Sequence, residues 1–116
     1  MMASMNTPPD NTYVQVVTTT ALREEAERIA RELVEARLAA CVQIVGPILS
    51  TYRWQGKIET GEEWQCWAKT RGELFARVEE AIRRIHPYEV PEIIAVPVVA
   101  GSAKYLAWVN AETDRG

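Results

Sequence analysis

The chain has 116 residues, of which 47% are apolar and 25% are charged, and its formal net charge is −3. This length and balance predict one globular domain with its own core, and they exclude a fibre or a wholly disordered chain. The acidic charge excludes a nucleic-acid backbone as the expected partner, because such partners need a clustered basic face. No apolar run reaches about 18 residues and no signal-peptide pattern is readable, so we expect a cytoplasmic protein without a membrane span.

The chain is predicted to begin with a leader, a strand and a helix. Residues 1–11 show no periodicity, so we expect a disordered leader followed by a single domain over 12–116. Residues 13–19 are β-branched and partly alternating, which predicts a strand. Apolar residues then recur at spacings of three and four, which predicts an amphipathic helix over 21–36. These residues are Leu22, Ala26, Ile29, Leu33 and Ala36.

The next segment predicts one long β-hairpin. Residues 39–54 form a strand with a bulge or bend at Gly46-Pro47, Gln55-Gly56 is the turn, and residues 57–70 return, interrupted near Thr60-Gly61. A strand of about 16 residues rises roughly 50 Å, whereas the two outer strands of about seven residues rise roughly 23 Å, so about half of the hairpin overhangs its sheet. We interpret the overhang as an oligomerisation arm, because monomers avoid exposed edges with aromatic surface. Its aromatic residues are Tyr52, Trp54, Trp64 and Trp67.

The remaining segment predicts a helix, a strand and a short final helix. Apolar residues from Leu74 to Ile85 at helical spacing predict a second amphipathic helix, which His86-Pro87 ends. Residues 93–99 form the last strand, with Pro97 at an edge or a bulge, and residues 102–111 form a short C-terminal helix or turn. The order β-α-β-β-α-β with right-handed crossovers predicts an α+β, ferredoxin-like sandwich: a four-stranded antiparallel sheet with both helices on one face.

The segment from His86 to Ile94 holds the only histidine, two of the six prolines and two glutamates. Its prolines stiffen the backbone, so the donor side chains of His86, Tyr88, Glu89 and Glu92 can converge at little entropic cost. A neutral imidazole is a good metal ligand or acid–base group. The alternative is a capping histidine in a rigid loop that follows a helix C-terminus. We expect the functional site beside His86.

From about Tyr13 to Ala111 the sequence resembles the CutA family of divalent-cation tolerance proteins. The resemblance is carried by ordered, unusual phrases at matching intervals: Leu38-Ala-Ala-Cys-Val42, Tyr52-Arg-Trp-Gln-Gly-Lys-Ile-Glu59, Lys69-Thr70, His86-Pro-Tyr-Glu-Val-Pro-Glu-Ile-Ile94 and Tyr105-Leu-Ala-Trp108. It implies a ferredoxin-like homotrimer built by pairing of the long hairpins, binding clefts between subunits, and a role in the response to metal ions, especially copper. It implies no reaction. The sequence also shows no phosphate-cradling loop and no nucleophile with an evident base, so we expect no enzyme.

The resemblance implies two groups of site residues. The candidate metal ligands are His86, Cys41, Glu89 and Glu59, for Cu(II) or another divalent cation that folding does not require. The candidates for binding a small ligand in the cleft are Tyr52, Trp54, Lys69, Tyr88, Tyr105 and Trp108. The sequence also departs from the family. Thr18 and Ala81 stand where some members carry extra cysteines, which weakens the case for a multi-thiolate copper site.

Two functions of different classes remain open. One is a metal-binding module, and the other is a trimeric adaptor or small-ligand sensor, similar in architecture to the signalling trimers called PII, in which Lys69 and aromatic walls hold an anion. Simpler roles also remain: Cys41 as a small buried hydrophobe, Lys69 as a charge paired with Glu59 or Glu63, and the tryptophans as packing between subunits. We expect Cys41 and Cys66 to be free thiols.

Overall fold

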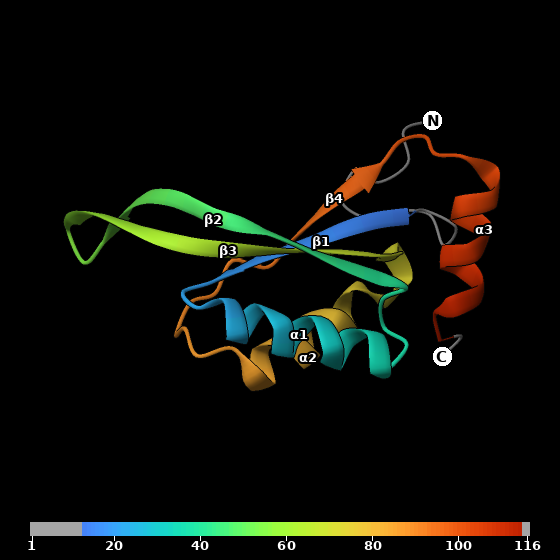
Figure 1. The fold of residues 1–116 in the computed structure, drawn as a ribbon, viewed down its shortest axis with the longest axis horizontal. Helices are drawn as coiled ribbons and strands as arrows, with labels where there is room; N and C mark the ends of the chain where they lie inside the picture. The colour runs from blue at the N-terminus through green and yellow to red at the C-terminus, as the bar shows by residue number, and fades with distance from the viewer. Residues whose placement is uncertain (1–12, 115–116) are drawn as a thin grey trace, which may run out of the picture.

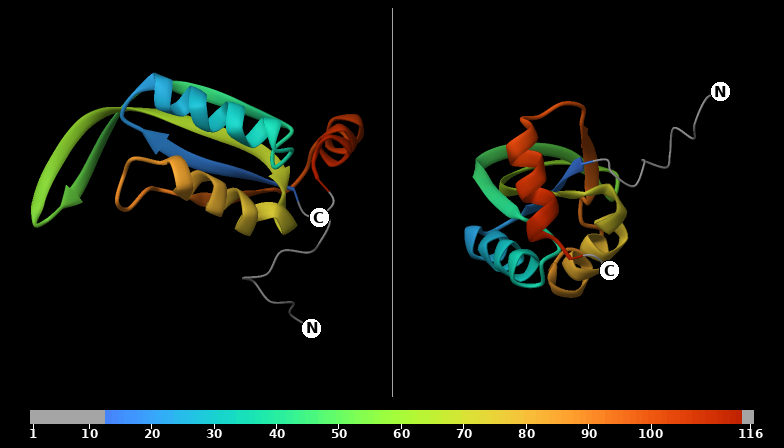
Figure 2. Two further views of the ribbon diagram at one scale, coloured as in Figure 1. Left: turned by 90° about the horizontal axis from the view of Figure 1, so that it is seen from below. Right: turned by 90° about the vertical axis from the view of Figure 1, so that its right-hand side faces the viewer.

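A computed structural model describes residues 13–114. Its elements are β1 (Tyr13–Thr20), α1 (Arg23–Glu35), β2 (Cys41–Trp54), β3 (Lys57–Arg71), a 3₁₀ turn (Gly72–Leu74), α2 (Phe75–Ile85), β4 (Ile94–Val98) and α3 (Ala103–Glu112). The strands form one antiparallel sheet in the order β2-β3-β1-β4, and α1 and α2 cover one of its faces (Figure 1, Figure 2). The α+β, ferredoxin-like prediction is confirmed. The predicted leader over 1–11 lies outside the described residues.

The core lies between the sheet and the two long helices. Strand alternation turns Val14 and Val16 of β1 and Cys66 and Ala68 of β3 toward the helices, where all four are buried. The helices bury a matching stripe at spacings of three and four. This stripe consists of Ala26, Ile29 and Leu33 from α1 and Val78, Ala81 and Ile82 from α2. Burial of each large aliphatic side chain contributes about 1.5–3 kcal/mol, so this layer supplies much of the folding free energy. No helix within residues 13–114 is long and apolar enough to cross a membrane.

β2 and β3 form the predicted long hairpin, which extends well beyond the rest of the sheet (Figure 1). β1 pairs with β3 only from Trp64 to Arg71, so among the described strands residues 57–63 pair with β2 alone. The predicted bulge at Gly46-Pro47 is confirmed by a register shift between Val45 and Ile48. The predicted interruption at Thr60-Gly61 is wrong, because both residues pair with β2. We call residues 48–63 the arm.

Only part of the predicted aromatic surface lies on the arm. Tyr52 and Trp54 are there, opposite Glu59 and Lys57. Trp64 and Trp67 are not on the arm, because they lie opposite Thr20 and Val17 in the part of β3 that pairs with β1. The placement of these two tryptophans on the overhang was therefore wrong.

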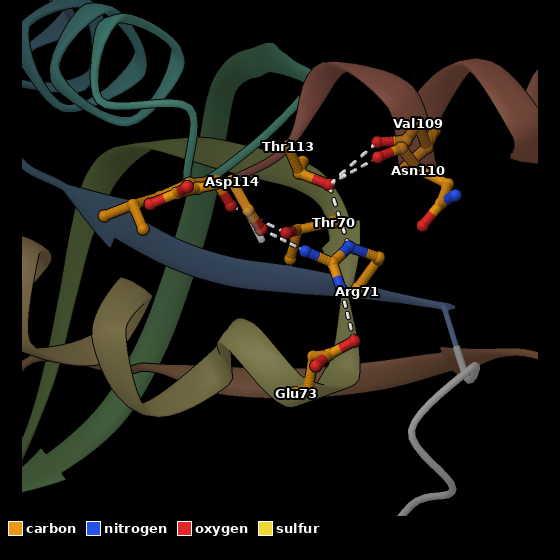
Figure 3. Close-up of polar contacts among 8 residues, drawn as sticks. Thr70, Arg71, Glu73, Val109, Asn110, Thr113 and Asp114 are labelled. Carbon is orange, nitrogen blue, oxygen red and sulfur yellow. Dashed lines mark hydrogen bonds and ion pairs between the residues drawn. The ribbon is translucent and has the colours of Figure 1, made fainter. Parts of the chain in front are cut away.

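The last helix is attached mainly at its C-terminal end. α3 buries only Val109 among its own described residues, and Thr113 just beyond it is also buried. Arg71, at the end of β3, is 3% exposed, and its side chain donates its Nε–H to Thr113 Oγ1 at 2.9 Å. The same guanidinium contacts Glu73 and the backbone carbonyl of Asp114 (Figure 3). Arg71 therefore joins the sheet to the end of α3.

β4 lies at an edge of the sheet. This position confirms the prediction made from Pro97, which has no N–H to donate to a second neighbouring strand.

Candidate functional site

An open cleft of about 870 Å³ lies between the arm and the loop that joins α2 to β4. Three aromatic side chains line it, Tyr52 and Trp54 from the arm and Tyr88 from the loop. The charged residues in its lining within the described structure are Glu59, Glu63, Glu89, Glu92 and Arg53. Because this lining carries four acidic residues and one basic residue, the potential in the cleft is negative and attracts cations. We call this cavity the arm cleft.

His86 holds the loop against the sheet. Its backbone is extended, as the following proline requires, and the residue as a whole is 9% exposed. Nε2 lies 2.7 Å from the carbonyl oxygen of Thr19, and Nδ1 accepts the backbone N–H of Tyr88 at 3.1 Å. These partners require the proton on Nε2. Both ring nitrogens are thus engaged with backbone groups, and in this structure His86 positions Tyr88 at the wall of the arm cleft.

Tyr88 connects the loop to the arm. Its hydroxyl donates to Glu63 Oε2 at 2.7 Å. Burial and the neighbouring Glu63 carboxylate raise the pKa of Tyr88 above its ordinary value, so the hydroxyl remains a donor at neutral pH. Burial and the charge of Glu63 also raise the pKa of Glu92. The charge of Glu63 therefore disfavours a second negative charge on Glu92, and a bound cation would relieve that effect.

The structure divides the predicted site residues between two places. Five of them line the arm cleft: Tyr52, Trp54, Glu59, Tyr88 and Glu89. Four others belong to the opposite end of the hairpin and to α3: Cys41, Lys69, Tyr105 and Trp108. From Cys41 to Tyr52 the strand extends roughly 36 Å. Within residues 13–114, no three His, Cys, Asp or Glu side chains come together to hold a metal ion, so one chain does not assemble the predicted ligand set.

The opposite end of the hairpin has its own contacts. Cys41 pairs with Lys69 across the hairpin, and the Lys69 ammonium donates to Gln43 Oε1. The alternative pairing of Lys69 with Glu59 or Glu63 is wrong, because both glutamates lie on the arm. On α3 the ring centroids of Tyr105 and Trp108 lie 5.7 Å apart. The pKa of Tyr105 is raised mainly by burial and to a smaller extent by the electrostatic effect of Cys41. Cys41 and Cys66 are both free, as the sequence predicts.

Two charged residues that line the arm cleft, Glu63 and Arg53, are given no site role by the sequence analysis. Glu63 enters it only as a possible partner for Lys69, and Arg53 only as part of a phrase that carries the family resemblance. Glu63 follows Glu59 by four residues on one strand, so period-two alternation places both side chains on the same face as Tyr52. That alternation was the available signal for Glu63. Arg53 alternates to the other face in an ideal strand, and no local pattern places it at the arm cleft.

Comparison with known proteins identifies one family. A family model described as "CutA1 divalent ion tolerance protein" matches residues 14–112. The divalent-cation tolerance protein CutA of Thermus thermophilus is 43% identical over 98 residues, which cover 84% of this chain and 95% of that protein. The mouse protein CutA is 47% identical over 89 residues, but these span 77% of this chain and only 50% of the mouse protein.

Solved structures show the same likeness in three dimensions. The Thermus thermophilus Cut A1 structure superposes with a TM-score of 0.85 at 41% identity, covering 88% of this chain and 99% of that one. The CutA1 structure from Oryza sativa gives a TM-score of 0.88 at 37% identity, covering 90% and 96%. Because sequence and fold agree over most of its length, this chain belongs to the CutA1 family of divalent ion tolerance proteins.

Proposed function

We propose that this chain is a non-enzymatic, homotrimeric, cytoplasmic protein that binds a divalent cation, with Cu(II) as the ion and metal tolerance as its role. The observation that carries the proposal is the arm cleft, whose lining includes four glutamates and one arginine. Relatives named "Divalent-cation tolerance protein CutA" in Thermus thermophilus and Archaeoglobus fulgidus support the same class of ligand.

The arrangement of donors supports a site that forms between subunits. Glu59 and Glu89 are the two predicted ligands that line the arm cleft of one chain, and they offer oxygen atoms. His86 can become a ligand only if its Nδ1 releases the amide of Tyr88. A nitrogen ligand of this kind would favour Cu(II) over hard ions such as Mg²⁺. Cys41 can reach the arm cleft only from another copy of the chain, because it lies at the far end of β2.

Exposed apolar side chains support assembly through the arm. Leu49 is 76% exposed and Ile58 is 68% exposed, and the hairpin register places both on the face of the arm opposite to the half-exposed Tyr52 and Trp54. Apolar side chains exposed on both faces of a projecting ribbon mark an interaction surface. We therefore assign the subunit contact to the arm, and the charged outer surfaces of α1 and α2 to solvent.

Calorimetry tests the metal proposal. Cu(II) and Zn(II) are titrated into the wild type and into the double variant Glu59→Gln/Glu89→Gln, which keeps side-chain shape but removes two charges. The matched control is Glu62→Gln, on the same strand but outside the arm cleft lining. We expect the double variant to bind at least about tenfold more weakly, equivalent to 1.4 kcal/mol. Equal affinity in all three proteins would refute the proposal.

The anion-sensor alternative is tested separately. Phosphate is titrated into the wild type and into Lys69→Met. Phosphate binding that the substitution removes, with no binding of Cu(II) or Zn(II), would favour the sensor over the metal-binding module.

A further inference from the structure

The arm cleft is much larger than the coordination sphere of one ion. Its volume of about 870 Å³ falls in the range of roughly 300–1,000 Å³ that organic ligands occupy. In the described part of the chain, its carboxylates do not gather in a group of three that could hold a metal ion. The negative charge of the cleft is therefore spread along its walls.

The spread of charge follows the length of the arm. Glu59 and Glu63 lie on one face of β3, roughly 13 Å apart along the strand. Glu63 is held by the hydroxyl of Tyr88 at 2.7 Å. Glu89 and Glu92 stand on the opposite wall, in the loop. An extended ligand with positive charges at both ends can meet carboxylates along this length, whereas a single small cation meets them only at one point.

The aromatic walls distinguish an organic cation from an inorganic one. Tyr52 lies directly opposite Glu59 in the hairpin register, so a ring and a carboxylate stand side by side on one face of the arm. Trp54 and Tyr88 extend this surface. An alkylammonium is attracted to the faces of such rings, and its methylene groups bury apolar area against them. A hydrated metal ion has no methylene groups to bury there.

We propose that the arm cleft binds a linear polyamine, an aliphatic chain that carries ammonium groups at both ends. Its chain packs on Tyr52 and Tyr88, and its ammonium groups lie near the glutamates and away from Arg53. The loop wall is already formed, because His86 is bonded to Thr19 and to the amide of Tyr88. The inference goes beyond the proposed function and shares one feature with it, since both place positive charge in the same cleft.

Calorimetry on the full chain at low salt tests the proposal with four probes. Spermidine and 1,5-diaminopentane should bind, and 1,5-pentanediol, which has the same chain length as the diamine without charge, should not. Nα-acetyl-lysine amide carries a single ammonium and represents a lysine of a partner protein. It should bind at least tenfold more weakly than spermidine. Equal or tighter binding of the lysine amide, or no binding of spermidine at millimolar concentration, would overturn the proposal.

Variants separate recognition by the arm cleft from general attraction to an acidic protein. Glu59→Gln/Glu89→Gln should raise the Kd of spermidine at least tenfold, and Tyr52→Leu, which keeps apolar bulk but removes the ring, should raise it about fivefold. Glu62→Gln removes the same charge from the same strand outside the cleft and should leave the Kd within a factor of two. Circular dichroism and sedimentation check that each variant keeps its fold and assembly. A Glu62→Gln effect as large as that of the double variant would overturn the proposal.

Separate metal titrations make the two possible failures distinguishable. Copper and amines are never mixed, because they form complexes in solution. Metal binding without spermidine binding overturns this inference and leaves the proposed function standing. Spermidine binding without metal binding overturns the proposed function, and the polyamine site stands alone.

Discussion

Replacing Arg71 with methionine should free the end of α3 from the sheet. The buried guanidinium donates to Thr113 and to the carbonyl of Asp114, and it pairs with Glu73. Hydrogen bonds from a charged donor contribute about 1.5–3 kcal/mol each, and the pair with the half-exposed Glu73 adds less than about 1 kcal/mol. Methionine keeps part of the aliphatic packing. We therefore expect a loss of about 3–4 kcal/mol in the free energy of unfolding.

Urea denaturation at one fixed protein concentration measures this loss, because assembly would make stability depend on concentration. The control is Arg77→Met, which removes an exposed ion pair with the same Asp114 and should cost less than about 1 kcal/mol. Hydrogen exchange should show faster exchange of the amides from Tyr105 to Asp114 in Arg71→Met but not in the control. If the two variants differ by less than about 0.5 kcal/mol and exchange alike, the guanidinium does not anchor the helix.

Three further predictions concern assembly, the buried thiol and the bulge. Trp54→Asp should place a charge in the subunit contact and split the assembly, so sedimentation that shows a stable wild-type monomer at micromolar concentration would end the arm hypothesis. Burial raises the pKa of the Cys66 thiol from 9.0 to about 11. Between these pH values the unfolded chain loses a proton that the folded chain keeps, so the free energy of unfolding falls as pH rises, by up to about 3 kcal/mol. Cys66→Val should flatten this alkaline decline in urea denaturation, and an unchanged slope would contradict it. A Cβ at Gly46 would lie 2.6 Å from the ring of Trp64, so Gly46→Ala should cost about 1–3 kcal/mol of stability, and a variant as stable as the wild type would show that the ring can move aside.

The hairpin and helices could be predicted from sequence because their signals are local. Alternation around Gly46-Pro47 and the turn at Gln55-Gly56 fix which residues pair across β2 and β3. The position of β1 along β3 is not local. The pairing of β1 with β3 begins with Thr20 opposite Trp64, and no short-range pattern in the sequence marks this point. The expectation that Trp64 and Trp67 lie on the overhang fails for this reason.

The site was predictable where it follows a strand face and unpredictable where it depends on distant contacts. Tyr52, Trp54 and Glu59 lie in one short phrase and reach the arm cleft together. The bond between His86 and the carbonyl of Thr19 joins residues 67 apart in the chain, and no local pattern shows that the histidine supports the loop in a single chain. Cys41 was grouped with Glu59 by family resemblance, but the length of β2 separates them within one chain.

The open side of β2 makes the lone chain prone to aggregation. Among the described strands, β2 has a neighbour on one side only, over 14 residues, so its other side offers unpaired N–H and C=O groups to any extended segment. β4, at the opposite edge, is five residues long and contains Pro97, which blocks such growth. A substitution that weakens assembly without adding charge, such as Trp54→Ala, should therefore lower soluble yield and produce precipitate. Trp54→Asp should give a soluble monomer, because the same charge that separates the subunits also repels an incoming strand.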